Sequence, residues 1–125
     1  MTLNVMLIDD HPVVRAGLRA VLNSFDGVEV VAEAADGNAE VPDGVDVVVS
    51  DIQMPGADGI ALTRRLVAAG GPPVLILTTY DTQADVVAAV EAGAMGYLLK
   101  DAPEDELYEA CLLYTSDAAD ERSSG

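Results

Sequence analysis

Five short apolar runs alternate with segments of helical periodicity, and this alternation constrains the fold more than any other feature of the sequence. Runs so continuously apolar are typical of strands buried on both faces, as in a parallel sheet with helices on each side. We therefore predict an α/β protein built from βαβ units. The five predicted strands are Leu3–Ile8, Val28–Glu33, Val45–Ser50, Val74–Thr78 and Gly96–Leu99.

Three segments between the predicted strands carry helix signals. Pro12 suits an early helical position, so a first helix should begin there and end near Ser24. Asp58 is suited to cap a second helix, which the Gly70–Pro73 breaker should end. A third helix is predicted over Ala84–Ala92.

Two segments depart from this pattern. Only Gly37–Val41 lies between the second strand and the next turn signal, so a helix there should be one turn long or absent. From Cys111 onward, the sequence CLLYTSDAADERSSG no longer has apolar residues at regular helical spacing. Its first eleven residues resemble the translation of a sequencing adapter. We therefore predict one domain over residues 1–110, followed by a non-native tail over residues 111–125 that continues the last helix.

Composition excludes several classes of function. The 125 residues suit a single compact core. A net charge of −16 with only six Lys and Arg argues against direct nucleic-acid binding. The chain lacks an apolar run near the roughly 20 residues of a membrane span, and its start does not resemble a signal peptide, so we expect a cytoplasmic protein without membrane contact. The single cysteine, Cys111, excludes an internal disulfide and has no partners for a zinc site, which predicts an inert thiol.

Polar side chains at the ends of the apolar runs are the candidates for chemistry. Asp9 and Asp10 follow the first run, Asp51 follows the third, Thr78 follows the apolar part of the fourth, and Lys100 follows the fifth. In an open parallel sheet, ligands bind at the carboxyl ends of the strands, where the strand order reverses. If the first and third strands are neighbours, the three acids converge. Such a set of groups can hold Mg²⁺ and a phosphoryl group.

Four motifs then resemble one family, the receiver domain of bacterial response regulators. They are IDDHP (Ile8–Pro12), SDIQMPGADG (Ser50–Gly59), LTTYD (Leu77–Asp81) and AGAMGYLLKD (Ala92–Asp101). The DHP and LLKD spellings resemble the NarL/FixJ branch, also called LuxR-type. The resemblance covers residues 4–110 and implies a doubly wound, five-stranded parallel sheet of the flavodoxin-like or CheY-like kind, with strand order 2-1-3-4-5.

The resemblance implies a phosphoacceptor and a metal site. Asp51 matches the phosphorylated aspartate, a nucleophile toward phosphorus when cations neutralise the developing charge. Asp9 and Asp10 would bind Mg²⁺ together with Asp51 and the backbone carbonyl of Gln53, because this cation prefers oxygen ligands. Without the neighbouring motifs, these acids would be ordinary turn and strand-end residues.

The same resemblance assigns four further positions. Thr78 and Lys100 would each contact a phosphoryl oxygen. Tyr97 matches an aromatic switch residue, although an ordinary strand aromatic fits the sequence equally well. His11 is interpreted as a polar surface residue at the start of the first helix, because the family's phosphoryl group comes from a separate histidine kinase.

These residues predict a Mg²⁺-dependent receiver domain that accepts a phosphoryl group from a cognate histidine kinase and changes an output surface. Phosphotransfer and autodephosphorylation should be self-catalysed, so we predict a phosphoacceptor switch and not an enzyme. The parent protein should control transcription through a C-terminal helix-turn-helix domain, which this sequence lacks, and phosphorylation could drive homodimerisation. An alternative is a phosphorylation-independent interaction module, although such a module would be free to lose one of the site residues. A phosphohydrolase would need a second acid two residues after Asp51, where Gln53 stands.

Overall fold

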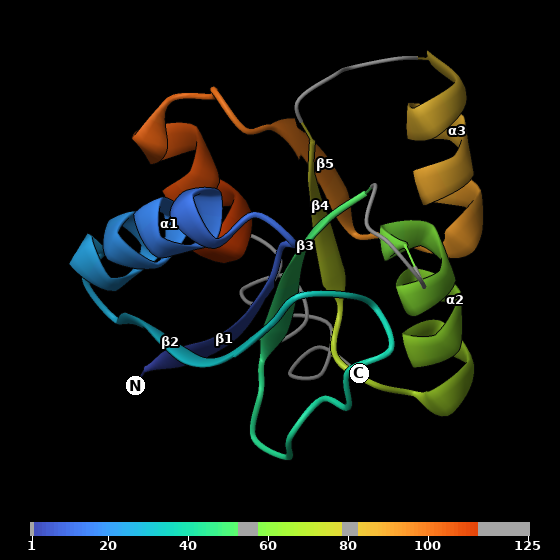
Figure 1. The fold of residues 1–125 in the computed structure, drawn as a ribbon, viewed down its shortest axis with the longest axis horizontal. Helices are drawn as coiled ribbons and strands as arrows, with labels where there is room; N and C mark the ends of the chain where they lie inside the picture. Colours follow the sequence, from blue (N-terminus) through green and yellow to red (C-terminus); the bar gives the residue numbers. More distant parts are fainter. Residues whose placement is uncertain (1, 53–57, 79–82, 113–125) are drawn as a thin grey trace, which may run out of the picture.

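A five-stranded parallel sheet lies between helices in the computed structural model, which describes residues 2–52, 58–78 and 83–112 (Figure 1). The strand order is β2-β1-β3-β4-β5, as the family resemblance predicted. The strands are β1 (Leu3–Ile8), β2 (Val28–Ala34), β3 (Val47–Asp51), β4 (Val74–Thr78) and β5 (Gly96–Leu99). The helices are α1 (Pro12–Ser24), α2 (Gly59–Ala69) and α3 (Gln83–Ala92), and a C-terminal helical segment covers residues 104–112.

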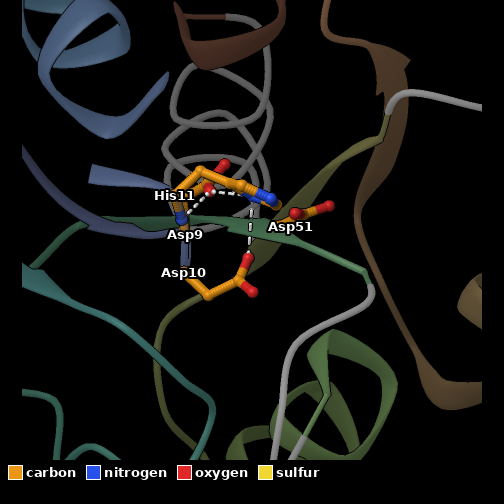
Figure 2. A group of neighbouring side chains, drawn as sticks. All are labelled: Asp9, Asp10, His11 and Asp51. Atoms are coloured by element: carbon orange, nitrogen blue, oxygen red, sulfur yellow. Dashed lines mark hydrogen bonds and ion pairs between the residues drawn. The ribbon is translucent and has the colours of Figure 1, made fainter. Parts of the chain in front are cut away.

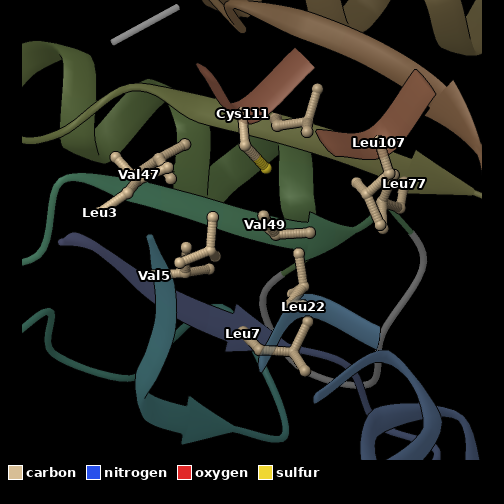
Figure 3. Close-up of a cluster of buried hydrophobic side chains, with 11 residues drawn as sticks. Leu3, Val5, Leu7, Leu22, Val47, Val49, Leu77, Leu107 and Cys111 are labelled. Atoms are coloured by element: carbon tan, nitrogen blue, oxygen red, sulfur yellow. The ribbon is translucent and has the colours of Figure 1, made fainter. Parts of the chain in front are cut away.

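Each face of the sheet has its own hydrophobic core. On the first face, alternate strand residues pack under α1 and the C-terminal helical segment, with Leu22 and Leu107 reaching in from these two elements (Figure 3). On the second face, the other set of strand residues packs under α2 and α3, which contribute Leu62, Leu66 and Ala89. The continuous apolar runs are therefore explained, because successive strand side chains enter different cores.

The elements begin and end where local sequence signals place them. Pro12 is the first residue of α1. The Asp58 side chain caps α2 by accepting a hydrogen bond from the Ala61 amide at 2.8 Å. Gly70 ends α2 with φ of 70°, a conformation that glycine adopts without steric cost. Two strands differ from the prediction. β2 extends one residue past the expected end at Glu33, to Ala34. β3 begins at Val47 and includes Asp51, whereas we expected it to cover Val45–Ser50.

A loop takes the place of a helix between β2 and β3. Residues 35–46 form bends and turns without a helical turn, which confirms that the short Gly37–Val41 segment does not build a full helix. Ala39, Val41 and Val45 pack against the second core, so apolar loop residues cover this face. The Arg65 side chain of α2 donates a hydrogen bond to the Ala39 carbonyl at 2.6 Å and ties the loop to the helix.

The pairing of β1 with β2 contains an irregularity at Val31. Val5 pairs with Val30, but the next residue, Met6, pairs with Ala32, so Val31 has no partner in the register. Val30 packs against the first core, whereas Ala32 packs against the second. The extra residue therefore reverses which face each later β2 side chain occupies, as a β-bulge does.

Candidate functional site

Two buried carboxylates lie side by side at the carboxyl ends of β1 and β3. These strands are neighbours, and Ile8 pairs with Ser50 in the parallel register. Asp9 therefore lies next to Asp51, which is the last residue of β3. The two residues are only 1% and 7% exposed, so each carboxylate needs partners within the protein. The predicted convergence of these acids is confirmed by the geometry.

Asp10 and His11 complete a cluster with these two acids, as Figure 2 shows. One ligand atom from each of the four residues lies within 4.8 Å of the others. His11 Nδ1 is 3.4 Å from Asp9 Oδ1 and 3.0 Å from Asp10 Oδ1, and the His11 amide donates a hydrogen bond to Asp9 Oδ1 at 2.8 Å. His11 is the N-cap residue of α1, and its side chain is 65% exposed. The expected surface position is confirmed, although its contacts with both acids were not predicted.

Lys100 supplies a positive charge to the two buried carboxylates. It follows β5, and its amide donates a hydrogen bond to the Thr78 carbonyl at 2.8 Å. Lys100 Nζ lies 2.6 Å from Asp9 Oδ2 and 3.1 Å from Asp51 Oδ2. Burial opposes the ammonium form, but the bonds to Asp9 and Asp51 outweigh it and raise the pKa of Lys100 above its ordinary value of 10.5.

The remaining predicted residues occupy the same sheet or lie outside the described part of the chain. Thr78 is buried at the carboxyl end of β4, where it pairs with Leu99. Tyr97 is half-buried in β5 and packs against the second core. Gln53, whose backbone carbonyl we expected to bind the metal, lies outside the described residues.

The donor set fits a hard divalent cation. Asp9, Asp10 and Asp51 provide carboxylate oxygens, the ligand type that Mg²⁺ prefers. Asp10 Oδ1 is shielded from solvent and accepts no hydrogen bond within the described residues, despite its close contact with His11 Nδ1. A buried carboxylate oxygen without a hydrogen-bond donor is a suitable position for a metal contact.

The start of α2 packs directly against Asp51. The Gly59 amide donates a hydrogen bond to the Ile52 carbonyl at 2.9 Å. A Cβ atom added to Gly59 would lie 2.2 Å from the Asp51 carbonyl oxygen. Any side chain at this position must therefore push the helix away from the strand that carries the proposed phosphoacceptor.

Sequence reasoning missed two residues beside the acids, Arg15 and Glu33. Arg15 Nη1 donates a hydrogen bond to the Asp9 carbonyl at 2.7 Å, and Arg15 Nε lies 3.2 Å from Glu33 Oε1. Arg15 lies one helical turn after the N-cap residue His11, but its bond to a backbone carbonyl leaves no sequence pattern that would have identified it. The position of Glu33 depends on the irregularity at Val31, which the periodicity of the sequence does not reveal.

Comparisons with known proteins agree with this geometry. A model of the response regulator receiver domain matches residues 5–112. The chain is 43% identical over 114 residues to the nitrate/nitrite response regulator protein NarP of Escherichia coli K12, a match that covers 85% of this chain and 52% of NarP.

The chain belongs to the response regulator receiver domain family. Among solved structures, the response regulator ChrA of a heme-sensing two-component system superposes with a TM-score of 0.83 and 61% identity, covering 99% of this chain and 67% of ChrA. The receiver domain of the putative response regulator NarL from Mycobacterium tuberculosis gives a TM-score of 0.82 and 34% identity, covering 92% and 97% of the two chains. This receiver domain is thus related to LuxR-family regulators, and it spans about half the length of the curated relatives that it matches.

Packing of this receiver domain continues past the predicted boundary at Ala110. Cys111 is fully buried in the first core, beside Leu107 and the strands (Figure 3). The family match likewise ends at residue 112. Cys111 therefore packs within the domain and not as part of the predicted tail. Residues 113–125, the rest of the predicted tail, lie outside the described part of the chain.

None of the helices within the described residues is both long and apolar enough to cross a membrane.

Proposed function

We propose that this receiver domain is a Mg²⁺-dependent phosphoacceptor and that Asp51 is its phosphorylated residue. The observation that carries the proposal is the position of the Asp51 carboxylate, which is buried beside Asp9 and 3.1 Å from Lys100 Nζ. A carboxylate in this setting is a nucleophile with a fixed ammonium ready to stabilise charge on the transferred oxygens. Mg²⁺ held by Asp9, Asp10 and Asp51 would supply further charge neutralisation.

The proposed donor is a phosphohistidine of a cognate histidine kinase. An Asp51 oxygen attacks the phosphorus, and a P–O bond forms as the P–N bond breaks, while the departing imidazole takes up a proton. Thr78 and Lys100 then contact the phosphoryl oxygens, and Tyr97 responds to the new position of Thr78. Water later attacks the phosphorus, which restores the carboxylate and releases inorganic phosphate. The chain thereby acts as a switch with self-catalysed transfer and hydrolysis.

Intact-mass spectrometry tests the proposed acceptor. Incubation with acetyl phosphate and MgCl₂ should add one phosphoryl mass, which hydroxylamine removes because an acyl phosphate is labile to it. Asp51→Asn should abolish the addition, while Asp36→Asn, in the loop after β2, should not. A wild-type chain that takes no phosphoryl group from acetyl phosphate or from phosphoramidate would favour the alternative, a phosphorylation-independent interaction module.

We further propose that the parent protein is a transcriptional regulator in which this domain controls a DNA-binding output domain. The relation to LuxR-family regulators supports this proposal. It is also supported by the extent of the match, because the chain covers only about half the length of the curated regulators.

Homodimerisation on phosphorylation is the associated proposal. Light scattering of the chain with and without phosphoramidate should show the mass double only in the phosphorylated sample, and an unchanged mass would contradict it.

We retain the proposal of a non-native tail for residues 113–125. A chain truncated after Leu112 should keep wild-type phosphorylation and lose less than about 1 kcal/mol of stability. Truncation after Ala110 should cost more, because it also removes the buried Cys111. A loss of several kcal/mol on truncation after Leu112 would show that these residues belong to the fold.

A further inference from the structure

The backbone carbonyl of Asp9 is bound by Arg15, a residue outside the cluster of acids. Asp9 is fixed at its amide by a hydrogen bond to the Ala34 carbonyl at 3.1 Å, and its carboxylate binds Lys100 and the His11 amide. Its carbonyl accepts a hydrogen bond from Arg15 Nη1 at 2.7 Å. This carbonyl belongs to the planar peptide group that joins Asp9 to Asp10. Fixing the carbonyl therefore fixes the peptide plane from which Asp10 extends.

Glu33 in turn orients Arg15. Glu33 Oε1 lies 3.2 Å from Arg15 Nε, and Glu33 Oε2 accepts a hydrogen bond from Arg19 Nη1 at 2.8 Å. Arg15 and Arg19 are four residues apart on α1, so both reach the same carboxylate. The side chains of Arg15 and Glu33 are 23% and 27% exposed, which limits solvent competition for their contacts.

The irregularity at Val31 is what directs Glu33 toward α1. Val28 and Val30 pack against the first core under α1, so in a regular strand Glu33 would point to the opposite face. Because Val31 has no partner in the register, Ala32 and Ala34 enter the second core instead, and Glu33 turns to the face that α1 covers. The shift in pairing therefore lets Glu33 of β2 contact Arg15, the residue that binds the Asp9 carbonyl.

We propose that Arg15, oriented by Glu33, is a positioning residue that sets the angle between Asp9 and Asp10 for Mg²⁺ binding and phosphoryl transfer. The proposal rests on the function proposed above. Arg15 acts through the Asp9 backbone and contacts neither the metal nor the phosphoryl group. Its planar guanidinium binds the carbonyl and the carboxylate at the same time through different nitrogen atoms, which a lysine ammonium at this position does less well.

Isothermal titration of the full chain with MgCl₂, at constant ionic strength, tests this inference. Arg15→Gln should raise the Mg²⁺ dissociation constant about tenfold, as loss of a residue that orients metal ligands commonly does. Arg19→Gln is the matched control, because it removes the same charge and also contacts Glu33 but does not contact Asp9. It should change the dissociation constant less than about twofold.

Two further variants separate positioning from folding. Glu33→Gln should weaken Mg²⁺ binding less than Arg15→Gln, and the double variant should be no worse than Arg15→Gln alone, because both changes act through one contact with Asp9. If Arg15→Gln does not fold, Arg15→Lys decides the question, since it keeps the charge and should still raise the dissociation constant severalfold. Equal dissociation constants for Arg15→Gln and Arg19→Gln, or for Arg15→Lys and the wild type, would overturn the inference.

Phosphorylation by phosphoramidate provides the second readout and separates the two proposals. Arg15→Gln should need more MgCl₂ to reach its half-maximal rate, with a smaller change in the rate at saturating MgCl₂. A wild-type chain that binds Mg²⁺ but is not phosphorylated at Asp51 would overturn the proposed function and leave the role of Arg15 in metal binding to be judged by the titrations. A wild-type chain that does not bind Mg²⁺ would overturn the inference together with the proposed cofactor.

Discussion

At the scale of single residues, Lys100 determines how Asp9 and Asp51 can be buried together. Two adjacent carboxylates repel each other, and the repulsion grows where water is excluded. The Lys100 ammonium contacts one oxygen of each carboxylate, so it offsets this repulsion. In the proposed mechanism, the same ammonium stabilises the negative charge that the phosphoryl group brings to the site.

Replacing Lys100 should therefore separate metal binding from phosphorylation. In Lys100→Ala, we expect MgCl₂ still to raise the thermal midpoint, because all three carboxylates remain. The rate of phosphorylation by acetyl phosphate should fall about 100-fold, because no ammonium faces the transferred oxygens. Arg64→Gln, at an exposed position of α2, is the charge-matched control and should keep the wild-type rate. An unchanged rate in Lys100→Ala would remove Lys100 from the site.

Alkaline pH should destabilise the fold through Cys111 and Lys100 together. Burial raises the pKa of the Cys111 thiol from 9.0 to about 11, so stability is complete below pH 9 and falls as the pH rises toward 11. The total loss should be on the order of 2 to 3 kcal/mol. The raised pKa of Lys100 acts in the same direction, because its ion pair is complete below pH 10.5 and is lost as the pH rises through the folded-state pKa. Denaturant unfolding of the wild type and of Cys111→Ala at pH 8 and pH 10.5 measures the thiol's part, and equal pH dependence in the two proteins would contradict it.

At the scale of secondary structure, α2 packs so closely on β3 at Gly59 that no larger side chain fits there. Gly59→Ala places a Cβ atom 2.2 Å from the Asp51 carbonyl oxygen, so the helix or the strand must move. We expect a loss of roughly 1–3 kcal/mol and slower phosphorylation of Asp51. Gly17→Ala in α1 is the matched control, because its Cβ meets nothing within 4 Å and alanine favours the helix by about 1 kcal/mol. Denaturant unfolding should show a lower free energy of unfolding for Gly59→Ala and a higher one for Gly17→Ala.

The bounds of most elements were predictable because the signals that set them are local. Pro12, Asp58 and Gly70 act within one turn of the helix ends that they define. The direction of Glu33 was not predictable, because it depends on how β2 pairs with β1, and the register is set by contacts distant in sequence. The family resemblance, and not the periodicity, supplied the strand order. Arg15 was missed because a side chain that binds a backbone carbonyl leaves no sequence pattern of its own.

At the scale of the whole molecule, acidic residues outnumber basic ones and the three site carboxylates add to a strongly negative protein. The chain carries 22 Asp and Glu against six Lys and Arg. Bringing Asp9, Asp10 and Asp51 together at one edge of the sheet therefore costs free energy that the hydrophobic cores must offset. A divalent cation that binds only the folded state relieves this repulsion and stabilises the fold by mass action.

Millimolar MgCl₂ should accordingly raise the thermal midpoint of the wild-type chain. Asp10→Ala should abolish the rise, because it removes the carboxylate whose Oδ1 accepts no hydrogen bond in the described structure. Asp10→Asn should be more stable than the wild type without metal, since it removes one of the repelling charges while keeping the shape of the side chain. Sodium chloride at matched ionic strength controls for general screening of the surface charge, which affects every variant alike. A rise of the same size in wild type and Asp10→Ala would mean that the cation acts on the overall charge and not at the cluster of acids, and the metal site would then have to be abandoned.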